Sequence, residues 1–239
     1  MAGVKQIGSK SPPKVNKAAK KKKQVRKPRT KNQDRWFLNH LEENLKTTKP
    51  WRTTNSVFYP SMLGNPCDRN LYLAYNGQLP EQVIEAKTVR IFDVGNSLEV
   101  RMKKYFEQTG IFIAAEQSVK FLNPPISGRY DFLLRHEEYG QVILELKSIN
   151  DTGFNDLIEA PKSDHLIQLQ IYLNLVGMEH GIVLYENKND QKLKAFKVVQ
   201  DTNLWESVLE RCIRIQTMLL TEMPARCNGD FFCSCRRVK

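Results

Sequence analysis

The residues most able to do chemistry are two acids in a predicted β-hairpin. Residues 129–135 and 141–148 are rich in strand-forming side chains and flank a polar turn. If this turn is centred near residue 138, residues whose numbers sum to about 276 face each other, which pairs Asp131 with Glu145. Two like charges about 5 Å apart repel each other, and a bound divalent cation removes this penalty. The hairpin therefore predicts a site for Mg²⁺ or Mn²⁺, which prefer hard oxygen ligands.

Lys147 is expected beside this pair of acids. Glu145 and Lys147 are two residues apart on one strand, so both project from the same face while Leu146 points to the other. The lysine ammonium could hold or activate a water molecule, or stabilise an oxyanion. The alternative is a surface hairpin with scattered charges. The apolar run at residues 142–144 argues against that alternative, because it is typical of an interior strand.

The elements that must position these residues alternate in type along the chain. Helical patterns occupy residues 34–48, 67–76, 81–106, 163–177 and 202–220. Strand patterns occupy residues 111–121, 129–135, 141–148, 181–187 and 192–199. An irregular stretch is marked by Pro50, Pro60, Gly64 and Pro66. This order predicts an α/β fold with a central mixed β-sheet flanked by helices.

Length and composition indicate one globular domain with a tail. The chain has 239 residues, of which 41% are hydrophobic and 26% charged. No run of about 18 apolar residues is present, so we expect no contact with a membrane, and the basic N-terminus lacks the apolar core of a signal peptide. These features predict an intracellular protein: cytoplasmic in a bacterium or a virus-infected bacterium, or nuclear if the source is eukaryotic. The five cysteines are therefore interpreted as thiols or metal ligands, with Cys212 as a thiol of the core.

The excess positive charge is concentrated in residues 1–35. This segment has 13 Lys and Arg and one acid, Asp34, whereas the rest of the chain has 24 basic and 25 acidic residues. Its lack of large apolar residues predicts disorder. We interpret it as an arm that binds DNA or RNA through phosphate charge; a solubilising arm and a nuclear-import signal are alternatives. At its centre lie four lysines: Lys20, Lys21, Lys22 and Lys23.

The hairpin residues resemble the signature of the PD-(D/E)XK nuclease superfamily. Thirteen residues separate Asp131 from the Glu145-Leu146-Lys147 sequence, and Gly128 with Asp131 is similar to the GxxD motif of RecB-type nucleases. The resemblance implies a restriction-endonuclease-like core over residues 36–239. The activity that it implies is the hydrolysis of phosphodiester bonds.

Two further motifs extend the resemblance over residues 95–172. Gln168 and Tyr172 match a QxxxY motif, whose spacing places both on one face of a helix. Glu99 stands four residues after Gly95, similar to a helix of this superfamily that carries His or Glu at that position. The implied metal ligands are Glu99, Asp131, Glu145 and the carbonyl of Leu146. The resemblance further implies that Lys147 orients the attacking water, and that Gln168 and Tyr172 position the substrate strand.

Four cysteines resemble the ligands of the iron–sulfur members of this group, which include the CRISPR-associated adaptation nuclease and the AddB-type nuclease domains. The segment around Cys67 is similar to their N-terminal cysteine segment, and Cys227, Cys233 and Cys235 follow near the C-terminus. The resemblance implies a [4Fe–4S] cluster that holds residues 222–239 near the first helices. The spacing departs from the family, because C-x5-C-x-C replaces the usual C-x2-C-x5-C. Zn²⁺ on the same thiolates and free thiols are therefore alternatives.

The implied function is metal-dependent hydrolysis of DNA. The favoured interpretation is an exonuclease of replication, recombination or repair. The expected partner is DNA, as single strands or duplex ends. An endonuclease or junction resolvase with the same core is one alternative. A nucleic-acid-binding protein that has a nuclease-like scaffold but no activity is another. The intact set of Asp131, Glu145 and Lys147 argues against the last alternative, because binding alone does not need these charges together.

Overall fold

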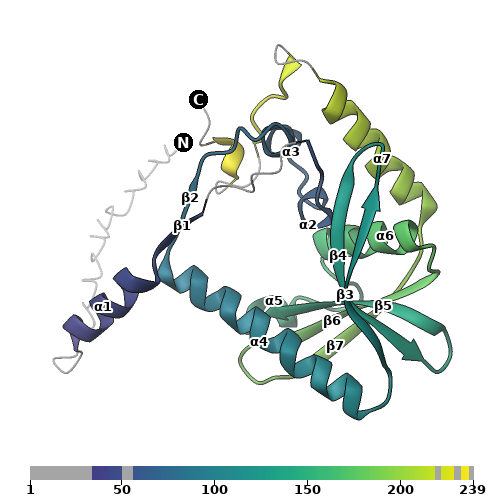
Figure 1. Cartoon of the computed structure of the whole chain (residues 1–239), viewed down its shortest axis with the longest axis horizontal. Coiled ribbons are helices and arrows are strands. Elements are labelled where there is room, and N and C mark those ends of the chain that lie inside the picture. The colour runs from purple at the N-terminus through teal and green to yellow at the C-terminus, as the bar shows by residue number, and fades with distance from the viewer. Residues whose placement is uncertain (1–33, 50–55, 219–221, 229–232, 237–239) are drawn as a thin grey trace, which may run out of the picture.

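The computed structural model describes residues 34–49, 56–218, 222–228 and 233–236. They form an α/β fold in which a five-stranded mixed sheet is flanked by helices (Figure 1). Within these ranges, no helix has the length and apolar character needed to cross a bilayer. Lys20, Lys21, Lys22 and Lys23, with most of the basic segment, lie outside the described residues, so the disorder of that segment stays a prediction.

Seven helices are described in these ranges, and five of them match the sequence patterns. The helices are α1 (Arg35–Leu45), α2 (Pro60–Leu63), α3 (Asp68–Tyr75), α4 (Ala86–Gln108), α5 (Asp151–Asn155), α6 (Ser163–Val176) and α7 (Thr202–Thr217), with a 3₁₀ turn, η2, at Ser234–Arg236. The strands are β1 (Thr47–Lys49), β2 (Gln82–Ile84), β3 (Phe112–Phe121), β4 (Ile126–His136), β5 (Gly140–Ile149), β6 (His180–Asn187) and β7 (Leu193–Val199). All five predicted strands are present as β3 to β7.

The helix predicted over residues 81–106 was wrong at its beginning. Residues Gln82–Ile84 form β2, which pairs with β1, and the helix α4 begins only at Ala86. The sequence also did not predict β1, α2 or α5. Elements of three to five residues contain too little periodicity to be found from a pattern, and β1 and β2 depend on each other across a segment that contains α2 and α3.

The sheet has the order β3-β4-β5-β6-β7, with β3 and β7 at its two edges. Strands β5 and β6 are parallel and the other neighbours are antiparallel. The parallel pair needs a crossover, which α5 and α6 provide. In the β4–β5 hairpin, Phe132 pairs with Leu144 and Leu134 with Val142. Both pairs sum to 276, so the predicted register is confirmed.

Helices α6 and α4 cover opposite faces of this sheet. Helix α6 contacts all five strands, whereas α4 contacts β3, β4 and β5. Because successive side chains of a strand point to opposite faces, Ile143 joins the core with Leu169 of α6, while Leu144 joins the core with Met102 of α4. The continuous apolar run in β5 is therefore explained by burial on both faces.

A further helical layer lies beyond α6 and consists of α2, α3 and α7 with the described C-terminal residues (Figure 1). Arg211 of α7 joins its parts: it donates to the Asp68 carboxylate at 2.8 Å and to the carbonyl oxygens of Leu63 and Asn65 at 2.9 and 2.6 Å. Cys212 is fully buried in this layer, which confirms its interpretation as a core thiol.

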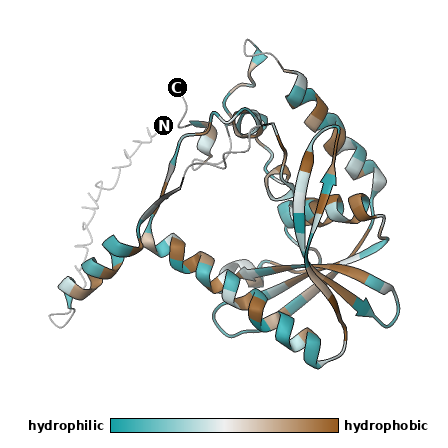
Figure 2. Cartoon of the chain, in the orientation of Figure 1, coloured by the Kyte–Doolittle hydropathy of each residue, from teal (hydrophilic) through white to brown (hydrophobic). Residues whose placement is uncertain are grey.

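The N-terminal half of α4 is less buried than its sequence pattern predicts. Leu98, Met102 and Phe106 are buried against the sheet, but Phe92 is 51% exposed. This part of α4 extends from the body of the molecule together with α1, and both contain hydrophobic residues (Figure 2). Phe92 is therefore available at the surface rather than part of the core.

Candidate active site

Glu145, Lys147 and Gln168 form the polar centre of the candidate site. Glu145 and Lys147 follow the apolar run of β5, and Gln168 comes from α6. Lys147 Nζ donates to Glu145 Oε1 at 2.7 Å and to Gln168 Oε1 at 3.1 Å. Gln168 Nε2 also donates to Glu145 Oε1, at 2.6 Å. The three side chains thus form a closed triangle of hydrogen bonds, in which each orients the other two.

Asp131 lies on β4 beside this triangle. Because Phe132 pairs with Leu144, Asp131 and Glu145 come next in the hairpin register. Asp131 Oδ2 accepts a hydrogen bond from the backbone N–H of Leu146 at 2.7 Å, which fixes the carboxylate against β5. The two acids are close enough that Asp131 raises the pKa of Glu145.

Burial controls the electrostatics of the three candidate carboxylates. Glu145 is 1% exposed, and desolvation together with Asp131 raises its pKa to about 8, although Lys147 acts in the opposite direction. Burial also raises the pKa of Asp131, against the effects of the Leu146 N–H and Lys147. The pKa of Glu99 is raised by burial and then by Asp131. Three acids therefore share a region in which burial disfavours their charged forms.

The donor groups of this region have the chemistry that suits a divalent cation. Glu145 Oε2 is buried and has no hydrogen-bond partner among the described residues. A buried carboxylate oxygen without a partner is costly, and a cation held against it removes that cost. The carboxylates of Glu99, Asp131 and Glu145, with the Leu146 carbonyl, are hard oxygen ligands of the kind that Mg²⁺ and Mn²⁺ prefer. The residues present are thus compatible with the ion that the sequence predicts.

Tyr172 lies one helical turn after Gln168, but outside the triangle. Its hydroxyl donates to the backbone carbonyl of Arg129 on β4 at 3.0 Å, and burial raises the pKa of this hydroxyl. Close packing surrounds the tyrosine: a Cβ added to Gly128 would lie 2.9 Å from its ring and 2.8 Å from Pro60. Tyr172 therefore holds α6 against β4 next to the site.

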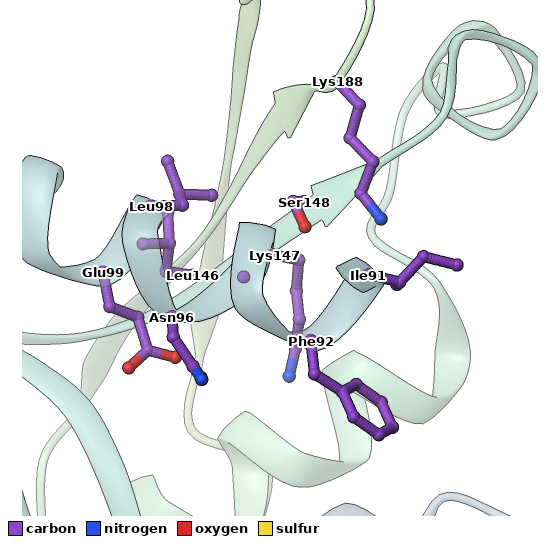
Figure 3. Close-up of a pocket in the computed structure, with 10 residues that line it drawn as sticks. Ile91, Phe92, Asn96, Leu98, Glu99, Leu146, Lys147, Ser148 and Lys188 are labelled. Atoms are coloured by element: carbon purple, nitrogen blue, oxygen red, sulfur yellow. The ribbon is translucent and has the colours of Figure 1, made fainter. Parts of the chain in front are cut away.

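Two cavities flank the triangle. The first, which we call the lysine cavity, has a volume of about 340 Å³ between α4 and β5, and Phe92, Glu99 and Lys147 lie on its wall (Figure 3). The second, which we call the serine cavity, has a volume of about 440 Å³ and is lined by Arg129 and Gln168. Its hydroxyl groups come from Tyr59, Ser61, Ser118, Ser127 and Tyr172. Because Lys147 borders one cavity and Gln168 the other, the triangle lies between them.

Glu116 is one residue of this region that the sequence did not indicate. It lies on β3 between Ala115 and Gln117, whose partners on β4 place it opposite Asp131. Its φ of +54° is rare for a residue with a side chain, and its carboxylate pairs with Arg129 at 2.9 Å. Glu116 raises the pKa of Asp131, so it adds negative potential to the site.

His165 and Tyr185 are two more such residues. His165 Nδ1 lies 2.7 Å from the hydroxyl oxygen of Tyr185, and Tyr185 pairs with Lys147 in the β5–β6 register. Burial, followed by the charge of Lys147, lowers the pKa of His165 to about 4. The available signal was the presence of polar groups in segments expected to be buried: His165 one turn before Gln168, and Tyr185 inside an apolar strand.

The four expected cysteines come together as a second candidate site, the cysteine site. Cys67 caps the N-terminus of α3, where its Sγ accepts from the Asn70 backbone N–H at 3.3 Å. The other three, Cys227, Cys233 and Cys235, belong to the described C-terminal residues, and all four Sγ atoms lie within 4.8 Å of one another. Burial raises the pKa of the Cys67 thiol to about 12. Four converging sulfurs are a donor set for a metal that prefers soft ligands.

No family model and no curated protein sequence matches this chain. Among solved structures, it is similar to that of SSO0001, with 20% identity over 75% of this chain and 83% of that chain and a TM-score of 0.46. It is also similar to the structure of LHK-Exo, an alkaline exonuclease from Laribacter hongkongensis, in complex with dAMP, with 14% identity over 66% of this chain and 85% of that chain and a TM-score of 0.49. A third similar structure is that of a phage-related exonuclease from Haemophilus somnus 129PT, with 15% identity over 72% of this chain and 98% of that chain and a TM-score of 0.46. At these identities the likeness concerns the fold.

Proposed function

We propose that this chain is a metal-dependent nuclease that hydrolyses phosphodiester bonds in DNA. One observation carries the proposal: Asp131, Glu145 and Lys147 converge, and the buried Glu145 Oε2 has no hydrogen-bond partner among the described residues. A site arranged only for stability has no reason to bury adjacent acids in this way. A site that holds a cation next to a phosphate does.

The proposed ligands of Mg²⁺ or Mn²⁺ are Glu99, Asp131, Glu145 and the Leu146 carbonyl. When bound, the ion polarises a phosphoryl oxygen and lowers the pKa of a coordinated water. The chain prepares this position in two ways. The Leu146 N–H orients Asp131. Lys147 and Gln168 both donate to Oε1 of Glu145, which leaves Oε2 without a hydrogen-bond partner in the part of the chain that the structure describes.

Lys147 has the second role in the proposed mechanism. In hydrolysis, a water oxygen forms a bond to phosphorus, an ester P–O bond breaks, and the leaving oxygen takes up a proton. Negative charge increases on the phosphoryl oxygens as the water attacks. The Lys147 ammonium, held in place by Glu145 and Gln168, orients the water and offsets this charge without having to reorganise.

The two cavities suggest how a strand of DNA would pass the site. The serine cavity offers Arg129 and several hydroxyl groups, which suit a backbone phosphate. The lysine cavity is bordered by Lys188 and the exposed ring of Phe92, a surface on which an unpaired base could stack (Figure 3). We therefore propose that the strand runs from one cavity to the other, with the scissile phosphate at the triangle.

Exonuclease action on single strands or duplex ends is the finer part of the proposal. It is supported by the resemblance of the GxxD and QxxxY motifs to RecB-type nucleases. The basic segment before Asp34 supplies the charge that would attract DNA at any sequence. Replication, recombination and repair are the processes in which we propose that such an enzyme acts.

The test is a nuclease assay with purified protein on end-labelled linear DNA and on closed circular single-stranded DNA. We expect shortening of linear DNA with Mg²⁺ or Mn²⁺ and none with EDTA. Lys147→Ala should lower the rate by about 100-fold or more, a typical cost of removing charge stabilisation from a transition state. Lys192→Ala is the matched control, because Lys192 is an exposed lysine paired with Asp190 at 2.8 Å.

Different outcomes would exclude different parts of the proposal. Equal rates for Lys147→Ala and the wild type would exclude the proposed role of Lys147. Full activity in EDTA would exclude the proposed requirement for a metal ion. Cleavage of closed circles would show an endonuclease. Tight binding of DNA without any product would show a binding protein on this fold.

A further inference from the structure

The cysteine site has a geometry that distinguishes between the two metal centres considered for it. The four Sγ atoms lie within 4.8 Å of one another, and those of Cys227 and Cys235 are 3.5 Å apart. The sulfurs around one Zn²⁺ ion, each at about 2.3 Å from it in a tetrahedron, lie roughly 3.8 Å from one another. The sulfurs around a [4Fe–4S] cluster lie roughly 6 Å apart, because each binds a different corner iron.

We propose that the cysteine site holds a single tetrahedral Zn²⁺ ion and not the [4Fe–4S] cluster that the family resemblance implies. All six separations among the four sulfurs fall below the spacing that a cluster needs, and the Cys227–Cys235 separation of 3.5 Å is close to that of a mononuclear site. To hold a cluster, Cys233 and Cys235 would have to move apart. Cys233 directly precedes the 3₁₀ turn η2 and Cys235 lies in it, with Ser234 between them. The two cysteines are 9% and 0% exposed.

The surroundings of the sulfurs agree with a structural zinc site. Such a site has four protein ligands and no open position, whereas a catalytic zinc keeps one position for water or substrate. Here all four positions are taken by cysteines, three of them buried. Asn70 adds a second contact: its side-chain amide lies 3.7 Å from Cys233 Sγ, and its backbone N–H lies 3.3 Å from Cys67 Sγ. Donors of this kind stabilise the negative charge of zinc-bound thiolates.

The zinc would join two parts of the chain that are far apart in sequence. Cys67 begins α3, and the other three ligands lie after α7. Arg69 of α3 also donates to the Pro224 carbonyl at 2.9 Å. We expect removal of the ion to loosen this segment and to leave the sheet intact. The inference is independent of the proposed nuclease activity, because it concerns different residues and a different metal.

The test is the metal content of the full-length protein, purified without oxygen from iron-replete cells so that an oxygen-sensitive cluster would survive. We expect about one zinc per chain, with neither iron nor acid-labile sulfide and no colour. Exchange of zinc for Co²⁺ should give the strong visible absorption bands of tetrahedral thiolate coordination. Brown protein with absorbance at about 400 nm, iron and labile sulfide would overturn the inference, and so would protein that contains neither metal.

Variants assign the metal to these cysteines. Cys67→Ser should lose most of the zinc, and Cys212→Ser should keep it, because Cys212 is a buried thiol outside the group of four sulfurs. Chelation should lower the melting temperature of the wild type and of Cys212→Ser, but have little effect on Cys67→Ser. Zinc retained in full by Cys67→Ser would contradict the assignment, even if the total content of the wild type were as expected.

Discussion

Glu145 combines two properties that rarely occur together in a side chain. It is 1% exposed, and one of its carboxylate oxygens has no hydrogen-bond partner in the described part of the chain. Its other oxygen accepts from both Lys147 and Gln168. A protein that needed only a stable strand would place an apolar residue here, as it does at Ile143 and Leu144. The retained carboxyl group therefore suggests that stability is given up for function.

Glu145→Gln is expected to stabilise the metal-free protein at alkaline pH. The pKa of Glu145 in the folded state is raised, to about 8, so its contribution is favourable below its ordinary value near 4.5 and is lost as the pH rises through about 8. Glutamine keeps the shape and cannot ionise. In EDTA at pH 9, we expect the variant to exceed the wild type by at least about 1 kcal/mol in free energy of unfolding.

The measurement is urea unfolding at pH 5 and pH 9, with and without Mg²⁺. Mg²⁺ should stabilise the wild type and have little effect on Glu145→Gln, which has lost a ligand charge. If the difference in free energy of unfolding between wild type and variant were the same at pH 5 and pH 9, this account of Glu145 would be contradicted.

His165 should produce the opposite pH dependence. Burial and the charge of Lys147 lower its pKa to about 4, so its contribution to stability is complete above its ordinary value near 6.5 and is lost as the pH falls toward about 4. Between pH 7 and pH 4, we expect His165→Gln to lose about 1–2 kcal/mol less stability than the wild type, after allowance for solvent screening. Urea unfolding at pH 7, 5.5 and 4 measures this, with His40→Gln on the exposed helix α1 as the control. Parallel pH profiles for wild type and His165→Gln would rule the effect out.

At the scale of elements, the site depends on how closely β4, α2 and α6 approach one another. Gly128 of β4 faces both Pro60 of α2 and the ring of Tyr172 on α6. There is no room for a Cβ at this point, so only glycine permits the contact. The same approach lets the Tyr172 hydroxyl reach the backbone of β4 at Arg129.

Gly128→Ala is expected to destabilise the fold and to slow hydrolysis. The new methyl group would lie 2.8 Å from Pro60 and 2.9 Å from Tyr172, and overpacking of this kind costs about 1–3 kcal/mol. Gly95→Ala is the matched comparison, because a Cβ there meets no atom within 4 Å and the position lies inside helix α4. It should stabilise by about 0.5–1 kcal/mol. Thermal unfolding of both variants checks this, and equal melting temperatures would show that the packing at Gly128 is unimportant.

The elements also show how far the sequence predicts this structure. The hairpin register could be predicted because it follows from one turn and from residues near each other in the chain. The surface position of Phe92 could not, since helical spacing does not show where a helix leaves its partner. Neither could the places of Glu116, His165 and Tyr185, because their neighbours come from other segments. Local pattern thus predicted the strands, Asp131 and Glu145, the family resemblance implied Glu99, and long-range packing decided the rest.

On the scale of the whole molecule, charge is unevenly distributed. Residues 1–35 contribute 13 basic side chains against one acid, and the rest of the chain is close to neutral, with 24 basic and 25 acidic residues. If DNA is the substrate, residues 1–35 would attract it at long range through their charge, and the nearly neutral rest of the chain would cleave it.

Deletion of residues 2–33 is expected to weaken DNA binding while it leaves the maximal rate of cleavage unchanged. At low salt, we expect a loss of affinity of about tenfold or more, which becomes smaller as salt rises because the release of each counterion into a more concentrated salt solution is less favourable. Fluorescence anisotropy at several salt concentrations measures it. Replacement of Lys20, Lys21, Lys22 and Lys23 by glutamine tests whether the four central lysines account for the effect. Equal salt slopes for deleted and full-length protein would contradict the role of the segment.

The edge strand β7 affects how copies of this protein meet. An open sheet edge offers unpaired backbone groups to which the strand of another molecule can add. Lys194 and Lys197 lie along β7, where Lys194 Nζ donates to the carbonyls of Phe154 and Leu157 and Lys197 lies 3.8 Å above the ring of Tyr139. An incoming strand would have to accommodate these cations at the edge. Concentrated samples should therefore resist fibril growth through this side, and exchange of both lysines for valine should promote it.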